Sequence, residues 1–500
     1  MSPPKKEILI LGGGIIGCTT AYYLTRHPSY SPSSCSVTII EATGIASGAS
    51  GRAGGLLATW AYPSALARLS FRLHAELAEE HDGEGKWGFR RVDCGEVKIR
   101  GRRVDEKGEN EGGRSGDGDG DDPGGLHHAS KPKSMKSSKS TSPRIPADLD
   151  WILNPNITAY EEMSGSRDTA QVDPYEFTTS MAALAREKGV KIIMGTAKGI
   201  NYRTNAAGER GSVESVTVIP TGDQEKQSDA AQTADSEMHE SNPDSNQHMT
   251  FSNSPITIPA THIILTLGPW TKSLLPTCPI SSARAHSVVL RPRLPVSAHV
   301  LFSEISMPLA PTPSTSPKNR IKKKPSSRSV TVTVTPEIYP RPSGTIYTCG
   351  PTQPESEIPL PPSTALVNAA LDPSRCADLV AQMAAVSDVM RDAEVVGRGV
   401  CYLPTVTESG VGGGRGPVLG RMGISKGMGK GVGKGSENGD GDEERKGGVF
   451  VGTGHTCWGI NNGPASGWVL ARCVFGVVEG QGEEEIMSGL EECEAWRYGL

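Results

Sequence analysis

The chain has 500 residues, a net charge of −5 and an isoelectric point of about 6.2, so it offers no basic surface for nucleic acid. It contains no run of 18 apolar residues, and we therefore expect no transmembrane segment. The ten cysteines are scattered without metal-ligand spacing, which indicates free thiols in a reducing compartment and predicts no metal site.

The first predicted elements form a strand–turn–helix unit. The apolar run Ile8–Leu11 predicts a buried parallel strand, and apolar residues at helical spacing follow from Ile15. The turn between them has the Gly-x-Gly-x-x-Gly spacing of a dinucleotide-binding site. Gly12 permits the tight turn, Gly14 lets a pyrophosphate approach the backbone, and Gly17 lets the helix pack closely on the strand.

A second predicted strand, 37–40, ends at Glu41. This acid can accept a hydrogen bond from a ribose 2′-hydroxyl and disfavours the 2′-phosphate of NADP. The pyrophosphate is expected to meet the free N–H groups of the helix that begins with Ile15 and Ile16. The glycine pattern alone does not separate FAD from NAD, and a plain glycine-rich turn is the alternative.

The segment after Glu41 is a turn of small residues, 47–56. Here the chain resembles the D-amino-acid-oxidase-like (DAO) superfamily of FAD-dependent oxidoreductases, in which such a turn packs against the flavin. Ser50 and Arg52 can bind phosphate or ribitol oxygens, and glycines remove side chains where a flat ring must touch backbone. A mobile glycine loop is the alternative. The cofactor contacts predicted here are Ser50, Gly51, Arg52, Ala53, Gly54, Gly55 and Leu56.

Four tracts are too polar to belong to a folded core, namely 101–144, 221–249, 310–328 and 423–448. They cannot bury enough apolar surface to offset their ordering entropy, so we expect disordered or mobile surface insertions. They could carry contacts with protein partners, and plain solvated insertion is the alternative.

The remaining elements follow the order of DAO-like enzymes along most of the chain outside the insertions. We expect an amphipathic helix over Pro63–His81, a strand at 95–99, a helix through Lys188, and a hairpin that pairs 213–218 with 256–260. The next segment, 262–270, resembles the family's second flavin-contacting strand and turn, which adds Gly268 and Trp270 to the predicted cofactor contacts. An ordinary buried strand that ends in a Gly-Pro turn is the alternative.

A mainly β region follows, with strands expected at 288–293, 330–336 and 344–350, a connection at 337–344, and a helix over Leu371–Met390. In DAO-like enzymes this sheet covers the flavin and forms the substrate pocket.

A carboxylate substrate requires an arginine, and Arg341, beside Tyr339 and Tyr347, is the predicted clamp. Arg291 and Arg52 compete for this role, and a surface arginine beside prolines is the alternative. Arg341 and Tyr339 are therefore candidate catalytic residues.

The C-terminal signal is a strand at 448–451, a glycine-rich turn and a helix. It resembles the DAO-like ending, in which the turn closes over the isoalloxazine and the helix N-terminus stabilises negative charge on the ring. His455 is either a third catalytic candidate near the reactive ring or a packing residue. The cofactor contacts predicted here are Gly454, Gly459, Ile460 and Asn461.

The segment 454–464 resembles an uncharacterised fungal branch of cytoplasmic oxidoreductases in this superfamily. Some members of that branch are associated with endosomal traffic. The resemblance implies a cytoplasmic protein, with peripheral endosomal association as a hint.

Together these features predict an α/β FAD-binding Rossmann-like domain plus an α+β substrate domain with a mainly antiparallel sheet. The FAD-binding domain is expected to comprise 1–90, 166–285 and 411–500, and the substrate domain 91–165 and 286–410.

The resemblance implies an oxidoreductase that oxidises an amine or amino-acid-like small molecule by hydride transfer to flavin N5. An NAD-dependent dehydrogenase and a flavin-bearing interaction factor with little redox activity are the alternatives. Some amine-oxidising relatives attach FAD through a cysteine near the position of Cys401, but the surroundings match poorly. We therefore expect noncovalent FAD.

Overall fold

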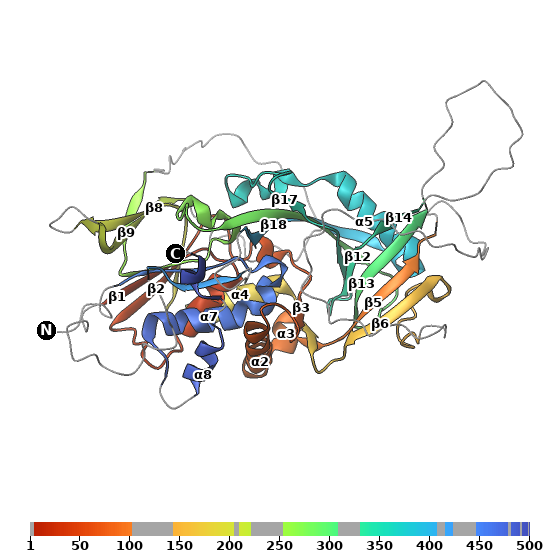
Figure 1. The fold of residues 1–500 in the computed structure, drawn as a ribbon, viewed down its shortest axis with the longest axis horizontal. Helices are drawn as coiled ribbons and strands as arrows, with labels where there is room; N and C mark the ends of the chain where they lie inside the picture. The colour runs from red at the N-terminus through yellow and green to blue at the C-terminus, as the bar shows by residue number, and fades with distance from the viewer. Residues whose placement is uncertain are drawn as a thin grey trace, which may run out of the picture.

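The computed structural model describes residues 5–102, 144–204, 210–221, 254–308, 331–407, 416–423, 447–478, 482–490, 493–498 and 500. The four expected insertions lie outside the described residues except at their ends. The described chain folds around two large sheets, with helices on the outer faces (Figure 1). No helix in these described ranges has the length and apolar character that a bilayer span requires.

The first sheet has eight strands in the order β10-β9-β8-β2-β1-β11-β20-β19. Its five central strands, from β8 to β20, run parallel, and both edges are antiparallel. The side chains of Ile8–Leu11 in β1 are buried, as expected for a central parallel strand with both faces covered. The strand bounds are β1 Lys6–Leu11, β2 Cys35–Glu41, β8 Lys191–Thr204, β9 Arg210–Pro220, β10 Ile256–Pro259, β11 His262–Leu265, β19 Val418–Arg421 and β20 Val449–Thr453.

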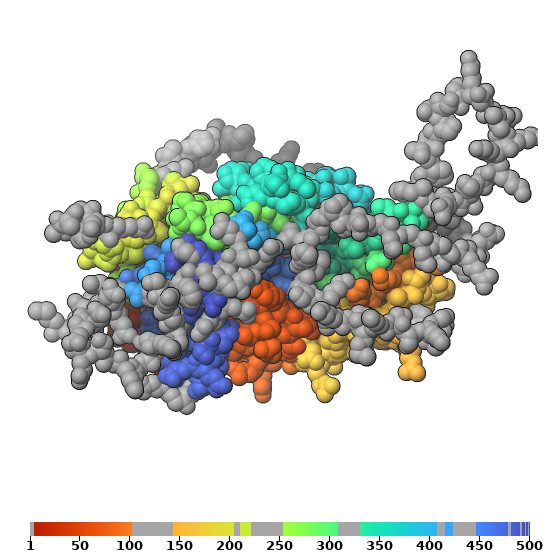
Figure 2. Space-filling model, in the orientation of Figure 1, coloured from red at the N-terminus to blue at the C-terminus, as the bar shows by residue number. Residues whose placement is uncertain are grey.

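Helices cover one face of this sheet and share its largest apolar core. In α1 and α7 the backbones lie close together, because a Cβ at Gly467 would lie 2.5 Å from the carbonyl carbon of Thr19. Segments from opposite ends of the chain are thus neighbours, and the blue C-terminal residues lie beside the orange residues of α2 and α3 in Figure 2. The helix bounds are α1 Ile15–Leu24, α2 Ser64–His81, α3 Gly83–Trp87, α4 Pro174–Arg186, α7 Gly459–Phe475 and α8 Glu483–Ser488.

The second sheet has nine strands, seven of them in the order β17-β12-β16-β15-β13-β5-β6, with β14 paired to β13 and β18 to β12. All its pairs are antiparallel except β13 with β5. The strand bounds are β5 Asp93–Arg100, β6 Ile157–Ser164, β12 Ile280–Arg291, β13 His299–Pro308, β14 Thr331–Val334, β15 Glu337–Pro340, β16 Ile346–Cys349, β17 Gln353–Pro354 and β18 Glu394–Val406.

The two faces of the second sheet have different neighbours. One packs on α5 (Pro373–Val386) and α6 (Asp388–Arg391). The other face meets a small sheet of β3 (Leu56–Ala58), β7 (Thr169–Gln171) and β4 (Arg90–Arg91). The predicted architecture, an α/β unit plus a mainly antiparallel sheet, is confirmed.

Two predicted elements need correction. The expected connection 337–344 contains strand β15, because Ile338 is buried in the core beneath α5 while Tyr339 is buried on the opposite face. The expected helix over Leu371–Met390 is two helices, since Ser387 is extended, at φ −153°, and caps α6 by accepting a hydrogen bond from Met390 N at 3.2 Å.

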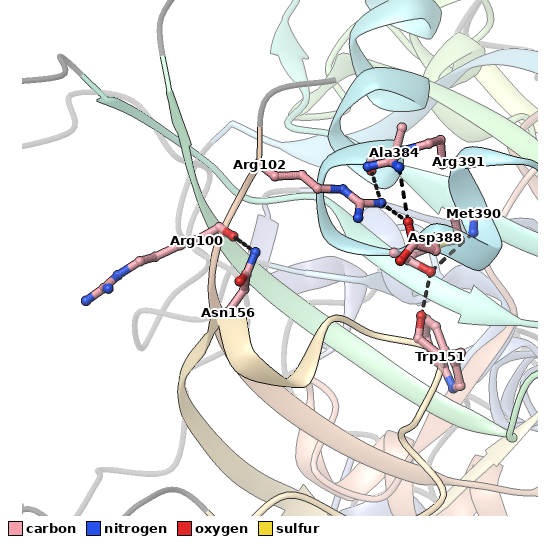
Figure 3. Close-up of polar contacts among 9 residues, drawn as sticks. Arg100, Arg102, Trp151, Asn156, Ala384, Asp388, Met390 and Arg391 are labelled. Carbon is pink, nitrogen blue, oxygen red and sulfur yellow. Dashed lines mark hydrogen bonds and ion pairs between the residues drawn. The ribbon is translucent and has the colours of Figure 1, made fainter. Parts of the chain in front are cut away.

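Polar contacts fasten the chain next to the first insertion (Figure 3). The Arg102 guanidinium reaches Asp388 at the start of α6 and the carbonyl of Ala384 in α5, and Arg391 contacts the same carboxylate. The hydrogen bond from Arg102 holds the pKa of Asp388 below its usual value. The described start of the first expected insertion, 101–102, is thereby held at the α5–α6 junction.

Candidate functional site

A pocket of about 1300 Å³, counting space open to the solvent, lies at the carboxyl ends of the parallel strands. Its walls include Gly12 after β1, Glu41 at the end of β2, Thr266 after β11 and Thr453 at the end of β20. Open α/β sheets bind ligands at this edge, and the pocket lining reaches across the carboxyl ends of four parallel strands. The pocket therefore has the position and the extent along the sheet edge that a dinucleotide site requires.

The glycine turn after β1 brings the start of α1 to the wall of the pocket. Gly12 has φ +113°, and a Cβ there would lie 2.4 Å from the carbonyl oxygen of Thr266. At Gly17 a Cβ would lie 2.0 Å from the carbonyl oxygen of Gly12, so helix and strand pack as closely as expected. Gly14 lines the pocket together with Ile15 and Ile16. The positive end of the α1 dipole thus lies at the pocket wall.

Glu41 is the one charged side chain among the lining residues that the structure describes. Its Oε2 accepts a hydrogen bond from Gly13 N at 2.7 Å, and Oε1 accepts one from Thr43 N at 2.9 Å. These bonds fix the carboxylate beside the glycine turn. Because no basic side chain is among these lining residues, a diphosphate would have to be held by backbone N–H groups and the helix dipole.

The small-residue turn places only part of the predicted set at the pocket. Ser50 and Ala53 line it, and Ser50 Oγ accepts a hydrogen bond from Ile15 N at 2.9 Å. Arg52 is directed elsewhere, because its Nη1 donates to the carbonyl oxygen of Val400 in β18 at 2.6 Å. Burial lowers the pKa of Arg52.

The glycines of this turn are adjacent to protein rather than to the pocket. A Cβ at Gly51 would lie 2.3 Å from Ala46 O, one at Gly54 2.9 Å from the Tyr339 ring, and one at Gly55 2.1 Å from Val172 O. Neither they nor Leu56 are among the lining residues. These small residues allow the turn to press against β15 and the β7–α4 connection.

Gly268 and Trp270 line the pocket from the turn after β11. Gly268 has φ +55°, and its carbonyl accepts a hydrogen bond from Thr453 Oγ1 at 2.9 Å. Trp270 Nε1 donates a hydrogen bond to the carbonyl oxygen of Pro361 at 2.8 Å. This bond holds the loop that contains Pro361, which follows β17 of the second sheet, against the pocket.

The C-terminal turn, 454–459, forms another wall. His455, Gly459 and Ile460 line the pocket, whereas Gly454 and Asn461 do not. Asn461 instead accepts a hydrogen bond from Ala58 N at 2.7 Å, which joins α7 to β3. The N-terminus of α7 therefore lies at the pocket. Although α7 is far from α1 in the sequence, both helices begin at the same edge of the sheet.

His455 is buried and shares a hydrogen bond of 2.8 Å between its Nε2 and Ser466 Oγ. Burial lowers the pKa of His455 to about 3, so the ring is neutral at physiological pH. It can position a neighbour but carries no charge toward the pocket.

This burial predicts a pH dependence of stability. In the unfolded chain His455 has a pKa near 6.5, so acid protonates the unfolded state first and the free energy of unfolding falls below about pH 6.5. At pH 5 the loss from this residue is roughly 2 kcal/mol. We expect the drop in urea midpoint between pH 7.5 and 5.0 to be smaller in His455→Gln. Equal drops in both proteins would contradict the assignment.

Arg341 and Tyr339 lie outside the pocket lining, on the inner face of the second sheet. Arg341 Nη2 donates to Ala53 O at 2.8 Å, and Nη1 lies 3.6 Å from the carboxylate of Asp173. Its buried Nε has no hydrogen-bond partner among the described residues. Tyr339 Oη donates to a carboxylate oxygen of Glu337. Arg341 thus fastens the small-residue turn to the sheet, with one donor still available.

Several lining residues were not predicted, because they come from segments without a local motif. Gly195, Thr196 and Ala197 lie in β8, and Leu403 and Pro404 lie in β18. Only their positions across the two sheets bring them to the pocket. Cys457 also lines the pocket and stands inside the predicted C-terminal turn, where no sequence pattern distinguishes it from its neighbours.

Comparisons with known proteins agree with this geometry. The family described as "FAD dependent oxidoreductase" (DAO) matches residues 7–473. The protein named "Putative oxidoreductase TDA3" of Saccharomyces cerevisiae is 29% identical, across 95% of this chain and 92% of its own length. "Putative oxidoreductase C1F5.03c" of Schizosaccharomyces pombe is 28% identical, across 94% of each chain. Among solved structures, glycine oxidase from Bacillus cereus superposes with a TM-score of 0.56 at 15% identity, across 97% of this chain and 98% of its own.

Proposed function

We infer that this chain, which belongs to the DAO family of FAD-dependent oxidoreductases, binds FAD noncovalently in this pocket and oxidises an amine or amino-acid-like small molecule. The observation that carries the proposal is the position of the glycine turn, the α1 N-terminus and Glu41 around one pocket at the carboxyl edge of the parallel sheet. The dehydrogenase and interaction-factor alternatives gain no comparable support.

The pocket residues suggest how the cofactor is held. Gly14 and the first N–H groups of α1 would bind the diphosphate, and Glu41 would accept a hydrogen bond from the adenosine ribose. Gly268 and Trp270 on one side, and His455 to Ile460 on the other, would enclose the isoalloxazine. The N-terminus of α7 would then favour negative charge on the ring.

The substrate class is proposed from the family and its structural neighbours. FAD held in this pocket would supply a two-electron acceptor for the hydride on the carbon next to nitrogen, so that the amine would become an imine. The neighbour from Bacillus cereus is named a glycine oxidase, and another, from Proteus vulgaris, an L-amino acid deaminase. The protein's own part is to orient the substrate carbon against the ring and to exclude water.

The predicted domain division stays a proposal, which strand membership supports. Every strand of the eight-stranded sheet falls in 1–90, 166–285 or 411–500. The strands of the nine-stranded sheet fall in 91–165 or 286–410, apart from the first half of β12. A cytoplasmic location, and contacts of the insertions with protein partners, also stay predictions.

The proposal is tested by anaerobic titration of the purified yellow protein with a panel of primary and secondary amines and amino acids. We expect at least one compound to bleach the visible flavin bands, and air or another acceptor to restore them. A protein that keeps its oxidised spectrum with the entire panel would contradict the proposed activity.

Cys401 is the residue at which a covalent bond to the flavin would be expected. Burial raises the pKa of this thiol to about 11, so it is not a ready nucleophile. We expect acid precipitation to release all the yellow colour into the supernatant. A yellow pellet that becomes colourless in Cys401→Ser would show a covalent bond to this residue instead.

A further inference from the structure

Part of the wall of the cofactor pocket is a connection of the second sheet. The chain between β17 and α5 (Figure 1), residues 355–372, contains the short helix η4 (Thr364–Ala370). Pro362, Ser363 and Thr364 from this segment line the pocket. We call residues 355–372 the strap, because both its ends join elements of the nine-stranded sheet and its cover while its middle reaches the pocket of the other sheet.

Two hydrogen bonds hold the middle of the strap against the FAD-binding sheet. Trp270 Nε1 donates to the carbonyl oxygen of Pro361 at 2.8 Å. The hydroxyl groups of Thr43 and Thr364 share a hydrogen bond of 2.9 Å, and Thr43 N donates to the Glu41 carboxylate. The strap therefore borders the half of the pocket where Glu41 is expected to hold the adenosine ribose. Both bonds join protein to protein, so they hold the strap whether the pocket is filled or empty.

Arg284 in β12 fastens the two ends of the strap to each other. Its Nε and Nη2 donate to the side-chain oxygen of Gln353 in β17, at 3.1 and 2.7 Å, and its Nη1 donates to the carbonyl oxygen of Ala370 at 3.0 Å. Only 9% of Arg284 is exposed, and hydrogen bonds from a charged donor are stronger than neutral ones. Two residues along β12, His286 Nε2 accepts a hydrogen bond from Asp372 N at 3.0 Å. Neither Arg284 nor Gln353 lines the pocket.

The strap itself buries little apolar surface. Of residues 355–372, all of which the structure describes, only Val367 is buried, and it packs with Val400 and Tyr402 of β18. A segment with few buried apolar contacts opens locally more readily than the core does. The polar bonds at its ends and middle therefore decide how often the strap leaves the pocket.

We propose that the strap is a gate for the flavin cofactor, that it opens when FAD enters or leaves, and that Arg284 sets how often it opens. The inference rests on the proposed function, because it takes the pocket to be the FAD site. When the open state is only a small fraction of the protein, entry of the ligand is slowed by that fraction. Exit is slowed in the same way, so the gate lengthens the residence of FAD without changing its affinity.

The test measures the release rate and the affinity of the cofactor separately. Holoprotein that carries radiolabelled FAD is mixed with excess unlabelled FAD, and the label that stays on the protein after gel filtration gives the release rate. Equilibrium dialysis with labelled FAD gives Kd.

Arg284→Met removes the donors of the clasp and keeps a long unbranched side chain. We expect release to become at least about tenfold faster, as for the loss of a charge-assisted hydrogen bond. We expect Kd to stay within about threefold of the parent value, because the lost bonds favour the closed strap equally in the filled and the empty protein. If the strap were merely a wall that binds FAD, Kd would rise in proportion to the release rate, and that result would contradict the gate.

Hydrogen exchange followed by mass spectrometry separates a loosened strap from a loosened sheet. In Arg284→Met the faster exchange should be confined to residues 353–372. Faster exchange throughout the nine-stranded sheet would mean that Arg284 holds the sheet together, and it would overturn the role given to this residue.

Gln353→Leu is the second variant, and it removes the acceptor of two of the three bonds from Arg284. It should also speed release with little change in Kd, and it carries the test if Arg284→Met does not fold. Arg102→Met is the matched control, because Arg102 also donates to a main-chain carbonyl, of Ala384, and to a side-chain oxygen, of Asp388, outside the pocket lining. It should release FAD at the parent rate.

The outcomes distinguish the gate from the cofactor assignment. A folded protein that binds no FAD refutes the assignment of the pocket. A protein that binds FAD but releases it at the parent rate in Arg284→Met and Gln353→Leu refutes only the gate. Equal acceleration in Arg102→Met would likewise overturn it, since that change leaves the strap fastened.

Discussion

Gly14→Val is expected to give a folded protein that purifies without FAD. The nearest atom to a Cβ at this position is the movable hydroxyl of Ser50, 3.1 Å away, so the fold can accommodate the change. The valine methyl groups, however, would project from the pocket wall at the start of α1, where the diphosphate must reach backbone N–H groups. The measurement is the ratio of flavin to protein absorbance after purification and after incubation with excess FAD.

Gly199→Val is the matched control for this variant. Gly199 lies in β8 outside the pocket lining, and a Cβ there meets no atom within 4 Å. It should retain the flavin of the parent protein. Full flavin occupancy in Gly14→Val would remove the glycine turn from the cofactor site.

Gly17→Ala is expected to reduce the stability of the protein itself. The new Cβ would lie 2.0 Å from the Gly12 carbonyl oxygen and 2.8 Å from Thr266 Oγ1, and the first of these is backbone that cannot rotate away. Helix α1 would have to shift from β1, at a cost of about 3 kcal/mol in the free energy of unfolding. The measurement is urea unfolding of the flavin-free protein, so that lost cofactor binding does not contribute.

The comparison for this variant is Gly489→Ala, since the nearest atom to a Cβ at that glycine is the carbonyl oxygen of Ile486, 3.5 Å away. Its unfolding free energy should stay within about 0.5 kcal/mol of the parent. A Gly17→Ala protein as stable as this control would mean that α1 does not pack on β1 as described.

The local parts of the fold could be predicted from the sequence because their signals are local. The apolar run before Gly12 forms a buried parallel strand, and Glu41 ends the next one. The amphipathic pattern after Pro63 forms α2. In each case the apolar periodicity, and the glycine or proline that marks the boundary, lie within a few residues of the element that they define.

The rest could not be predicted, because it depends on contacts between distant segments. The Arg52 side chain donates a hydrogen bond to the carbonyl oxygen of Val400, about 350 residues away in the chain, and no sequence pattern predicts that bond. Tyr339 lies in strand β15, which was expected to be a connection because a proline stands at each end, Pro336 just before the strand and Pro340 as its last residue.

The measurement that tests the central claim most directly is the visible absorbance spectrum of the purified protein, followed by identification of the chromophore that denaturation releases. We predict a flavin spectrum and one FAD per chain in the supernatant. A colourless protein that takes up no FAD on incubation, while remaining folded by circular dichroism, would contradict the assignment of this pocket to the cofactor.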